Sequence, residues 1–302
     1  MYQREFSAAA LAAAQALLQG AYDLHTHTGP SLFPRRADDV QAVHEAAATG
    51  MVGLGIKSHE GDTAVRAGLL NAAQTGCRVY GGVVLNHHVG GINPAAVETS
   101  LKLGGRIVWL PTISSRQHVE FYSRQGKRFL GGQFRYGAGE GISVLTEEGA
   151  LIPELGEVLE LIEAAGAVLS TGHLSSGEAL AVAREYHGRQ RGGQLVMGHP
   201  DLNINQATLQ EQQEFADCGG WVEKCTLALH EAWGQVPVEE FASGIRSIGV
   251  ERCFLTTDAG GLDRGSSPDT LSRFVALVLE KKLLTEAEIR LLLVENPRRL
   301  VA

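Results

Sequence analysis

The chain has 302 residues, of which 44% are hydrophobic, 20% charged and only 6% aromatic. This apolar content excludes intrinsic disorder, and no apolar run is long enough to span a membrane, so we expect no membrane contact. The net charge of −8 argues against a nucleic-acid partner, because phosphate binding needs a surplus of Lys and Arg.

Two features bear on where the protein works. An alanine- and leucine-rich stretch within residues 1–20 loosely resembles a secretory signal peptide, but Glu5 lies where positive charge is needed and Gln15 interrupts the apolar run. We therefore expect an ordinary N-terminal helix there. The four cysteines are far apart and form no C-x-x-C pair, which favours free thiols in a reducing cytoplasm over a disulfide scaffold.

Short apolar runs alternate with longer helical patterns along the chain, and the runs are nearly continuous, as in parallel strands covered on both faces. The predicted strands are 21–28, 51–59, 78–88, 106–113, 167–173, 194–199, 221–227 and 253–258. The predicted helices are 38–49, 62–75, 94–103, 153–165, 176–187, 208–216, 237–248 and 267–280. Eight strand–helix pairs predict the α/β class and a (β/α)8 TIM barrel. An open doubly wound sheet is the alternative, but no G-x-G-x-x-G follows the first strand.

The organisation of the chain favours a single domain. No Pro/Gly-rich linker divides it, so we expect residues 1–302 to fold as one barrel. Thr285 and Glu288 have the spacing of a capping box for a last helix. Asn296 and Pro297 then predict the N-cap and first position of a final helical turn.

One connection is unusually long, from residue 114 to about 152, between the fourth strand and its helix. Since disordered segments avoid aromatic residues, we expect residues 116–150 to be a folded flap, an insertion that distorts the barrel. A contact between subunits of a homo-oligomer is the alternative. Its aromatic residues are Phe121, Tyr122, Phe129, Phe134 and Tyr136, and its basic residues are Arg116, Arg124, Lys127, Arg128 and Arg135.

The strongest chemical signal is His25-Thr-His27 on the first strand. Alternate residues of a strand point the same way, about 7 Å apart, so the two imidazoles can bind one metal ion. A buried, hydrogen-bonded pair is the alternative. His173, His199 and Asp258 end later strands, and in a barrel these ends share one rim, where active sites lie. The set therefore favours a metal site.

These motifs resemble the amidohydrolase superfamily of metal-dependent hydrolases, over residues 20–300. That family has an H-x-H on the first barrel strand, single histidines ending the fifth and sixth strands, and an aspartate ending the eighth. The resemblance implies an enzyme with a divalent metal, Zn²⁺ first and Mn²⁺ or Fe²⁺ as alternatives. The implied ligands are His25, His27, His173, His199 and Asp258.

The sequence departs from the family on the fourth strand, which lacks the lysine or glutamate that bridges two metals in many members. The one rim lysine on a strand end is Lys57, at the end of the second strand. It is either a bridging carbamate or an ammonium that binds a substrate carboxylate or pairs with Glu60. The metal count therefore stays open between one and two, with two favoured.

The resemblance also implies a mechanism, in which a metal-activated hydroxide attacks the substrate. Asp258 would accept the water proton and hand it to the leaving group. His199 would ligate the metal or steady the substrate oxygen. The alternative for Asp258 is a helix N-cap.

Other polar residues are candidate substrate contacts. His59 and His88 end strands and are either substrate contacts or supporting groups, and Arg36 in the first rim loop can meet a carboxylate or phosphate. Cys225 is interpreted as core packing, and His118 as an ordinary histidine. We expect a hydrolase of a small, anionic amide, lactone or ester. A decarboxylase or lyase of the same superfamily, or a phosphoesterase, is the alternative.

Overall fold

The computed structural model describes residues 5–127, 140–189 and 193–302. It divides into two compact units, which we call the first and the second unit. The first comprises Met1–Lys57, Val65–Gly81 and Glu223–Ala302, and the second comprises Ser58–Ala64 and Gly82–Val222. Within the described ranges, no helix is both long enough and apolar enough to cross a membrane.

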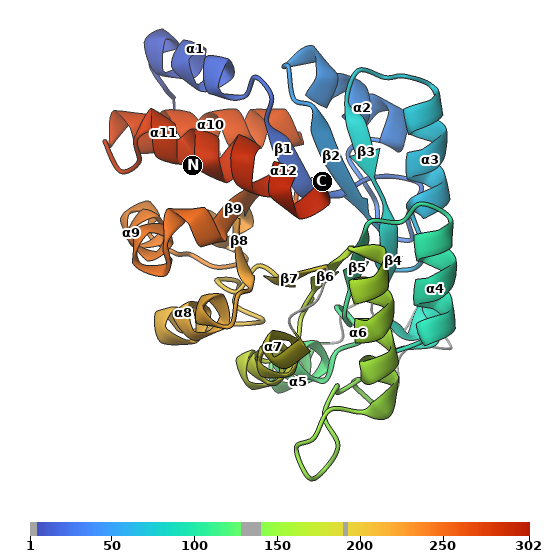
Figure 1. Cartoon of the computed structure of the whole chain (residues 1–302). Coiled ribbons are helices and arrows are strands. Elements are labelled where there is room, and N and C mark those ends of the chain that lie inside the picture. Colours follow the sequence, from blue (N-terminus) through green and yellow to red (C-terminus); the bar gives the residue numbers. More distant parts are fainter. Residues whose placement is uncertain (1–4, 128–139, 190–192) are drawn as a thin grey trace. The chain divides into compact units, whose positions relative to one another are not determined.

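The first unit is built on parallel strands near both ends of the chain. Strands β1 (Tyr22–His27), β2 (Gly53–Lys57) and β3 (Arg78–Tyr80) pair in that order (Figure 1). Strand β9 (Cys253–Thr256) lies beside β1, and a parallel bridge joins Thr26 to Ala259 just beyond it. The helices of this unit are α1 (Ala8–Leu17), α2 (Asp39–Ala48), α3 (Ala64–Ala72), α9 (Val238–Ile248), α10 (Ser267–Glu280), α11 (Glu286–Arg290) and α12 (Asn296–Val301). Helix α3 belongs to this unit from Val65 onward.

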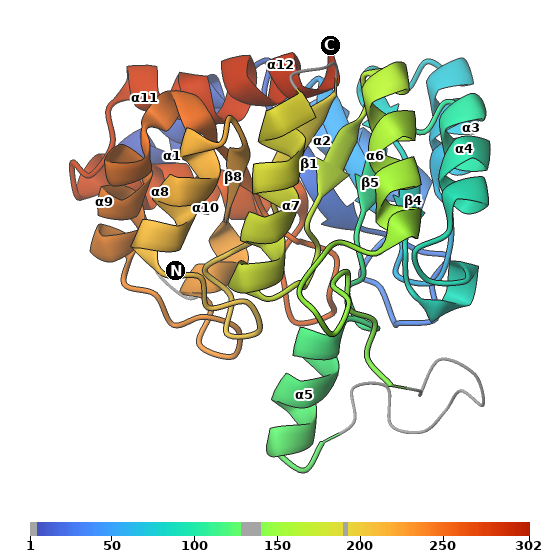
Figure 2. The same cartoon turned by 60° about the horizontal axis from the view of Figure 1, so that its bottom comes forward.

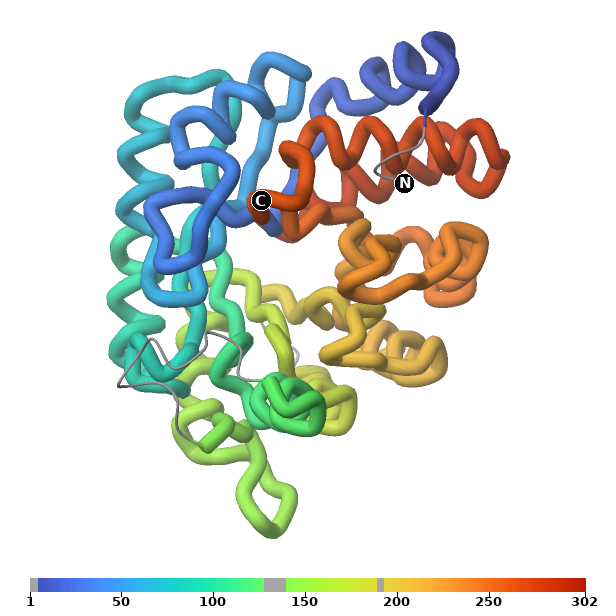
Figure 3. Tube along the Cα trace, turned by 180° about the vertical axis from the view of Figure 1, so that it is seen from behind, coloured from blue at the N-terminus to red at the C-terminus, as the bar shows by residue number. Residues whose placement is uncertain are grey.

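The predicted N-terminal helix is confirmed as α1. The Ser7 hydroxyl accepts a hydrogen bond from the Ala10 amide and caps the helix. Helix α1 lies along α10 near the other end of the chain, as the tube in Figure 3 shows. Ala14 and Leu17 are its buried side chains. Their burial agrees with an ordinary helix that packs as part of the first unit.

The second unit contains strands β4 (Gly82–Val84), β5 (Ile107–Trp109), β6 (Val168–Ser170) and β7 (Gln194–Met197), parallel and in sequence order, followed by the start of β8 (Trp221–Cys225). Its helices are α4 (Pro94–Lys102), α5 (Arg116–Arg124), α6 (Pro153–Ala165), α7 (Ser176–Arg189) and α8 (Leu209–Asp217). Leu110, Leu155, Leu169 and Phe215 are fully buried in its core. Strands β4 to β7 are mostly apolar, as expected where both faces of a parallel sheet are covered.

Two expectations about element boundaries are wrong. The strand predicted at 78–88 is two strands, β3 and β4, and the chain turns into a 3₁₀ turn at His87–Val89. Asn296 is not an N-cap, because α11 runs on through a π turn, Leu291–Glu295, into α12. Its side-chain amide instead donates to the carbonyls of Val250 and Cys253, at 2.8 and 2.7 Å. These long-range bonds fix the start of β9.

The long connection between β5 and α6 opens with a helix that the sequence pattern did not predict. Helix α5 extends away from the helices α4 and α6 that flank the sheet of the second unit (Figure 2). The predicted flap residues Arg128, Phe129, Phe134, Arg135 and Tyr136 lie outside the described residues. The role of the connection between β5 and α6 as a flap or as a subunit contact stays a prediction.

The predicted capping box at α11 is confirmed and joins a wider ion pair. Glu288 accepts from the Thr285 amide at 2.7 Å, and its carboxylate forms two bonds, 2.7 and 2.9 Å, with the Arg246 guanidinium. Chiefly through Arg246, these bonds lower the pKa of Glu288 from 4.5 to about 2. A carboxylate with a depressed pKa stabilises the fold above pH 4.5, and this stability is lost as the pH falls towards 2.

Glu288→Gln keeps the acceptor of the capping box but removes the charge. We expect it to lower the free energy of unfolding at pH 7 by about 1–2 kcal/mol, allowing for solvent screening. The difference from the parent protein should shrink between pH 4.5 and pH 3. Urea unfolding at pH 7 and pH 3 measures both quantities. The exposed neighbour Glu286→Gln serves as the control, and an equal loss in both variants would contradict the ion-pair argument.

Candidate metal centre

The end of β1 presents two buried imidazoles. His25 and His27 are only 2% and 3% exposed, and their ring centroids are 5.5 Å apart. The strand period places both on one side, as the sequence predicts. Asp23 is the first residue of this network. Its carboxylate accepts hydrogen bonds from the His25 amide at 3.2 Å and from the Thr257 and Ser267 hydroxyls. This buried carboxylate ties the histidine strand to the segment after β9. Burial raises its pKa to about 6 against the effect of these hydrogen bonds.

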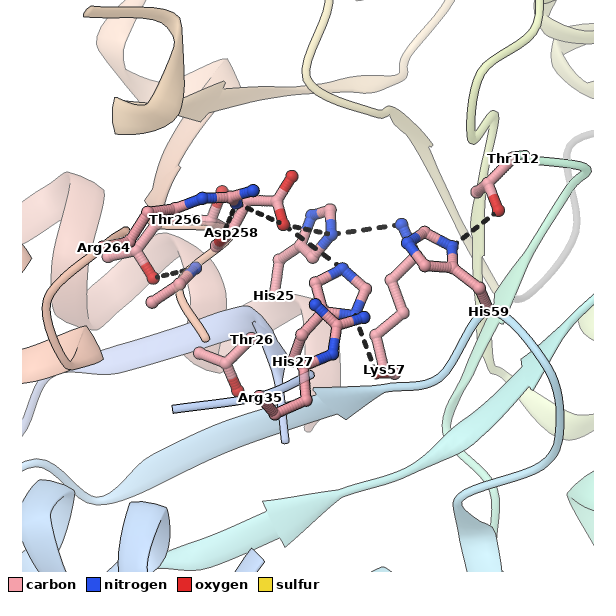
Figure 4. A network of polar contacts seen from close by, with 12 residues as sticks. His25, Thr26, His27, Arg35, Lys57, His59, Thr112, Thr256, Asp258 and Arg264 are labelled. Carbon is pink, nitrogen blue, oxygen red and sulfur yellow. Dashed lines mark hydrogen bonds and ion pairs between the residues drawn. The ribbon is translucent and has the colours of Figure 1, made fainter. Parts of the chain in front are cut away.

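The segment after β9 brings a carboxylate to the two imidazoles (Figure 4). The Asp258 amide donates to the His25 carbonyl at 2.9 Å. Asp258 Oδ1 then lies 3.2 Å from His27 Nε2 and 3.9 Å from His25 Nε2. The φ of Asp258 is +49°, a left-handed conformation that is uncommon outside glycine and concentrates at functional sites. The N-cap alternative is wrong, since Ser266 caps α10.

Each imidazole is oriented by a partner on its other nitrogen. His25 Nδ1 lies 2.6 Å from Glu223 Oε1, and His27 Nδ1 lies 2.9 Å from the Lys57 carbonyl oxygen. Both partners are acceptors, and for His27 the carbonyl is nearer to Nδ1 than the Arg35 guanidinium, at 2.9 against 3.3 Å. These contacts favour the tautomer with the proton on Nδ1. The Nε2 lone pairs of both rings then face the Asp258 side. A carboxylate or carbonyl behind a histidine is the usual support of a metal ligand.

Lys57 lies among these groups. Its side chain is almost fully buried, and Nζ is 3.1 Å from His25 Nε2. Burial lowers the pKa of Lys57, although Asp258 and Glu223 oppose that change. The predicted pairing partner, Glu60, belongs to the second unit. Lys57 thus contacts the same nitrogen that a metal would use.

Arginines give the centre a cationic border. Arg264 Nη1 donates to the Asp258 carbonyl at 2.6 Å and lies 3.5 Å from Asp258 Oδ1, while its guanidinium covers the Trp233 ring. Burial would raise the pKa of Asp258, but His25, His27 and Arg264 hold it well below its usual range. We therefore regard Asp258 as ionised. His27 stays neutral, because burial and the Arg35 cation lower its pKa.

The two arginines of the first rim loop have different surroundings. Arg36, the predicted substrate contact, forms a bidentate ion pair with Glu45 at 2.9–3.2 Å. Its neighbour Arg35 instead places Nη2 at 3.3 Å from His27 Nδ1. Arg35 therefore approaches the centre, while the role of Arg36 stays a prediction.

The second unit gathers another histidine cluster. The His173 ring centroid lies 4.8 Å from that of His199, 5.0 Å from that of His118 and 6.3 Å from that of His59. His59 Nδ1 is 2.9 Å from the Thr112 hydroxyl. His199 has a φ of +29°, again in the left-handed region. His118, interpreted from the sequence as ordinary, is buried, and burial followed by the effect of His199 lowers its pKa to about 3.

The remaining predicted residues are placed as follows. Burial lowers the pKa of His88, which lies in the second unit, and its role as a substrate contact stays a prediction. Cys225 is buried at the end of β8, and burial together with the Asp258 and Glu223 carboxylates raises the pKa of its thiol. This agrees with core packing rather than a thiolate nucleophile.

The donor set of the first unit fits a divalent ion. Two nitrogens or oxygens bound tetrahedrally at about 2.0–2.2 Å lie about 3.3–3.6 Å apart. The separations of 3.2 and 3.9 Å between Asp258 Oδ1 and the two histidine Nε2 atoms bracket this value. Two imidazoles and one carboxylate are ligands that Zn²⁺, Mn²⁺ and Fe²⁺ accept.

A family model described as "Family of unknown function (DUF6282)" matches residues 20–223. The chain belongs to this family. The match includes the H-x-H motif, Lys57, His173 and His199, and it ends at Glu223, before Asp258. No curated protein matches the chain.

Solved structures establish the fold. An amidohydrolase from Pseudomonas aeruginosa is 13% identical, with a TM-score of 0.58 over 96% of this chain and 98% of that one. A probable dipeptidase, PvdM, from the same organism is 11% identical, with a TM-score of 0.61 over 97% of both chains. A 2,6-dihydroxybenzoate decarboxylase is 13% identical, with a TM-score of 0.54 over 94% and 98%. These similarities confirm the predicted α/β class and (β/α)8 barrel fold, which the sequence resemblance to the amidohydrolase superfamily implied.

Sequence reasoning could assign the supporting residues only in part. Glu223 carried a signal, because a charge in a strand expected to be buried is normally paired or functional, but the sequence did not indicate its partner. Arg35 lies beside Arg36 in a loop that could bring a guanidinium to a substrate, and the sequence did not distinguish the two. Arg264 and, in the second unit, His118 gave no signal.

Proposed function

We propose that the chain is a metal-dependent hydrolase of a small organic amide, lactone or ester that carries an anionic group. The observation that carries this proposal is the convergence of His25 Nε2, His27 Nε2 and Asp258 Oδ1, with both Nδ1 atoms held by acceptors. The three solved structures described above are named as enzymes, and this chain shares their fold.

In this proposal, His25, His27 and Asp258 hold a divalent ion, Zn²⁺ first. When bound, such an ion polarises the substrate and supplies a strong nucleophile from water at neutral pH. The superfamily resemblance adds His173 and His199 as further ligands, with His199 as an alternative contact to the substrate oxygen. The proposal includes a site with either one or two bound ions.

Asp258 is proposed to move the proton. Its carboxylate is ionised and contacts His27 Nε2 and Arg264, so Oδ1 can accept a proton and pass it to the leaving group. Arg264 lowers the basicity of Asp258 while it stays beside it. An anionic substrate group that draws Arg264 away would therefore make Asp258 a better base.

The anionic substrate class rests on the cations at the centre. Arg264 and Arg35 both contact ligand residues of the first unit, and a guanidinium binds a carboxylate or phosphate in a planar, two-pronged geometry. Arg36, His59 and His88 remain proposed substrate contacts. Lys57 is proposed either as an ammonium for a substrate carboxylate or, since burial favours the neutral amine, as a bridging carbamate. The carbamate would add the mass of one CO₂ in native mass spectrometry.

A decarboxylase is the second candidate. The same cationic border would bind a carboxylic acid, and one of the matching structures is a decarboxylase. We place hydrolysis first because His199 supplies an additional imidazole. Release of CO₂ from a panel of carboxylic acids would favour the second candidate. Release of acid from lactones, esters and amides without CO₂ would favour the first.

Metal removal tests the proposal. We expect purified protein to contain one or two divalent ions per chain by elemental analysis. Dialysis against a chelator should abolish hydrolysis of whichever panel compound the protein cleaves, and added Zn²⁺ or Mn²⁺ should restore it. Full activity in the metal-free protein would overturn the proposal. We further propose a cytoplasmic location, and the assembly state is open to measurement by light scattering.

A further inference from the structure

Two residues at the start of α5 contact His173, and all three lie in the second unit. The Ser115 hydroxyl donates to the His173 carbonyl oxygen at 2.8 Å. His118 Nδ1 lies 2.8 Å from His173 Nδ1, and the two rings stack at 5.0 Å with an angle of 16° between their planes. Backbone and side chain of His173 are therefore held by the same short segment.

The two contacts belong to one rigid turn. Ser115 is the N-cap of α5, and its hydroxyl accepts from the His118 amide at 3.1 Å. Residues three apart face the same side of a helix. Both side chains are buried, with Ser115 at 0% and His118 at 1% exposure. A change of either contact therefore moves the other.

Further bonds fix the position of this turn. The Arg116 amide donates to the Ile142 carbonyl at 2.8 Å, and the Ile142 amide donates to the Ser114 carbonyl at 2.7 Å. Gln117 Nε2 donates to the Ile204 carbonyl at 2.7 Å. On its other face, the His118 ring lies 4.8 Å from that of Tyr122. The first turn of α5 is thus anchored independently of His173.

The short contact between two Nδ1 atoms needs one proton between them. If His173 donates it to His118, the lone pair of His173 stays on Nε2, where a metal can bind. If His118 donates it, the proton of neutral His173 is on Nε2 and blocks that atom. A side chain at position 118 that offers only a hydrogen-bond acceptor to His173 would enforce the arrangement in which His173 Nδ1 donates.

We propose that His118, together with Ser115, is a positioning residue that sets the ring orientation and tautomer of His173 for metal binding. This inference rests on the proposed function, in which His173 is a ligand. It gives the start of the β5–α6 connection a role that the sequence analysis did not foresee. The connection that contains the predicted flap would thereby also position His173.

The test compares zinc affinity and cobalt spectra in three variants of the full chain. His118→Leu fills the space without an acceptor, and we expect zinc affinity, measured by chelator competition, to fall about 10- to 100-fold. His118→Asn places an oxygen where Nδ1 lies, so it should keep affinity within about threefold. Ser123→Ala, at an exposed position of the same helix, should match the parent protein. The visible spectrum of the Co²⁺ form should change in His118→Leu alone.

The outcomes separate the two ideas. Zinc affinity in His118→Leu that equals the value in Ser123→Ala would overturn the inference while leaving the proposed function in place. A parent protein that binds no zinc would overturn the proposed function and the inference with it. Circular dichroism and thermal melting of the metal-free variants check their folding. If His118→Leu fails to fold, loss of affinity in folded His118→Asn, with Ser123→Ala unchanged, would also overturn the acceptor argument.

Discussion

Asp258→Asn is expected to lower kcat by about 10³-fold while leaving the fold intact. Asn keeps the size of the side chain, but its amide is a poor base and a weaker metal ligand. The backbone bonds of residue 258 to β1 do not depend on the side chain, so the protein should still fold. The measurement is hydrolysis of the panel compound that the parent protein cleaves best, with zinc content recorded alongside.

Asp263→Asn provides a matched control in the same loop. Asp263 is a carboxylate 3.5 Å from Arg264 Nε, but its side chain is 59% exposed. We expect this variant to retain most of the activity. If Asp258→Asn kept more than a tenth of the parent kcat with a full complement of metal, Asp258 would not be the base. If both variants lost activity equally, the effect would come from Arg264 rather than from the carboxylate at 258.

The sequence could predict the strands and the polar residues at their ends, because those signals are local. Apolar runs mark buried parallel strands, and a period of two places His25 and His27 on one side of β1. Helices α6 and α10 begin and end where predicted. Boundaries failed where long-range bonds decide, as at Asn296, whose amide binds carbonyls 43 and 46 residues away.

The supporting residues of the centre could not be predicted for the same reason. His25 and Glu223 are 198 residues apart, and Asp23 and Ser267 are 244 residues apart. Nothing near either residue in the chain indicates its partner. The choice between Arg35 and Arg36 also needed coordinates. Neighbouring residues of a loop point in different directions, and here one contacts His27 while the other pairs with Glu45.

His27→Ala should weaken zinc binding by more than about 100-fold, beyond the loss expected for a residue that only supports a ligand. The variant removes the Nε2 atom 3.2 Å from Asp258 Oδ1 and leaves the Lys57 carbonyl without that imidazole. With one nitrogen ligand fewer, the ion would be lost on dialysis, and hydrolysis would be lost with it. Chelator competition measures the affinity, and elemental analysis measures the retained metal.

His44→Ala is the control for this variant, because His44 is an exposed histidine of α2 in the same unit. It should bind zinc like the parent protein. Thermal melting of both metal-free variants separates a loss of ligand from a loss of fold. Parent-like zinc affinity in folded His27→Ala would show that the paired imidazoles of β1 are a hydrogen-bonded structural pair. The two-histidine motif would then be a feature of packing, and the metal would have to be sought among the histidines of the second unit.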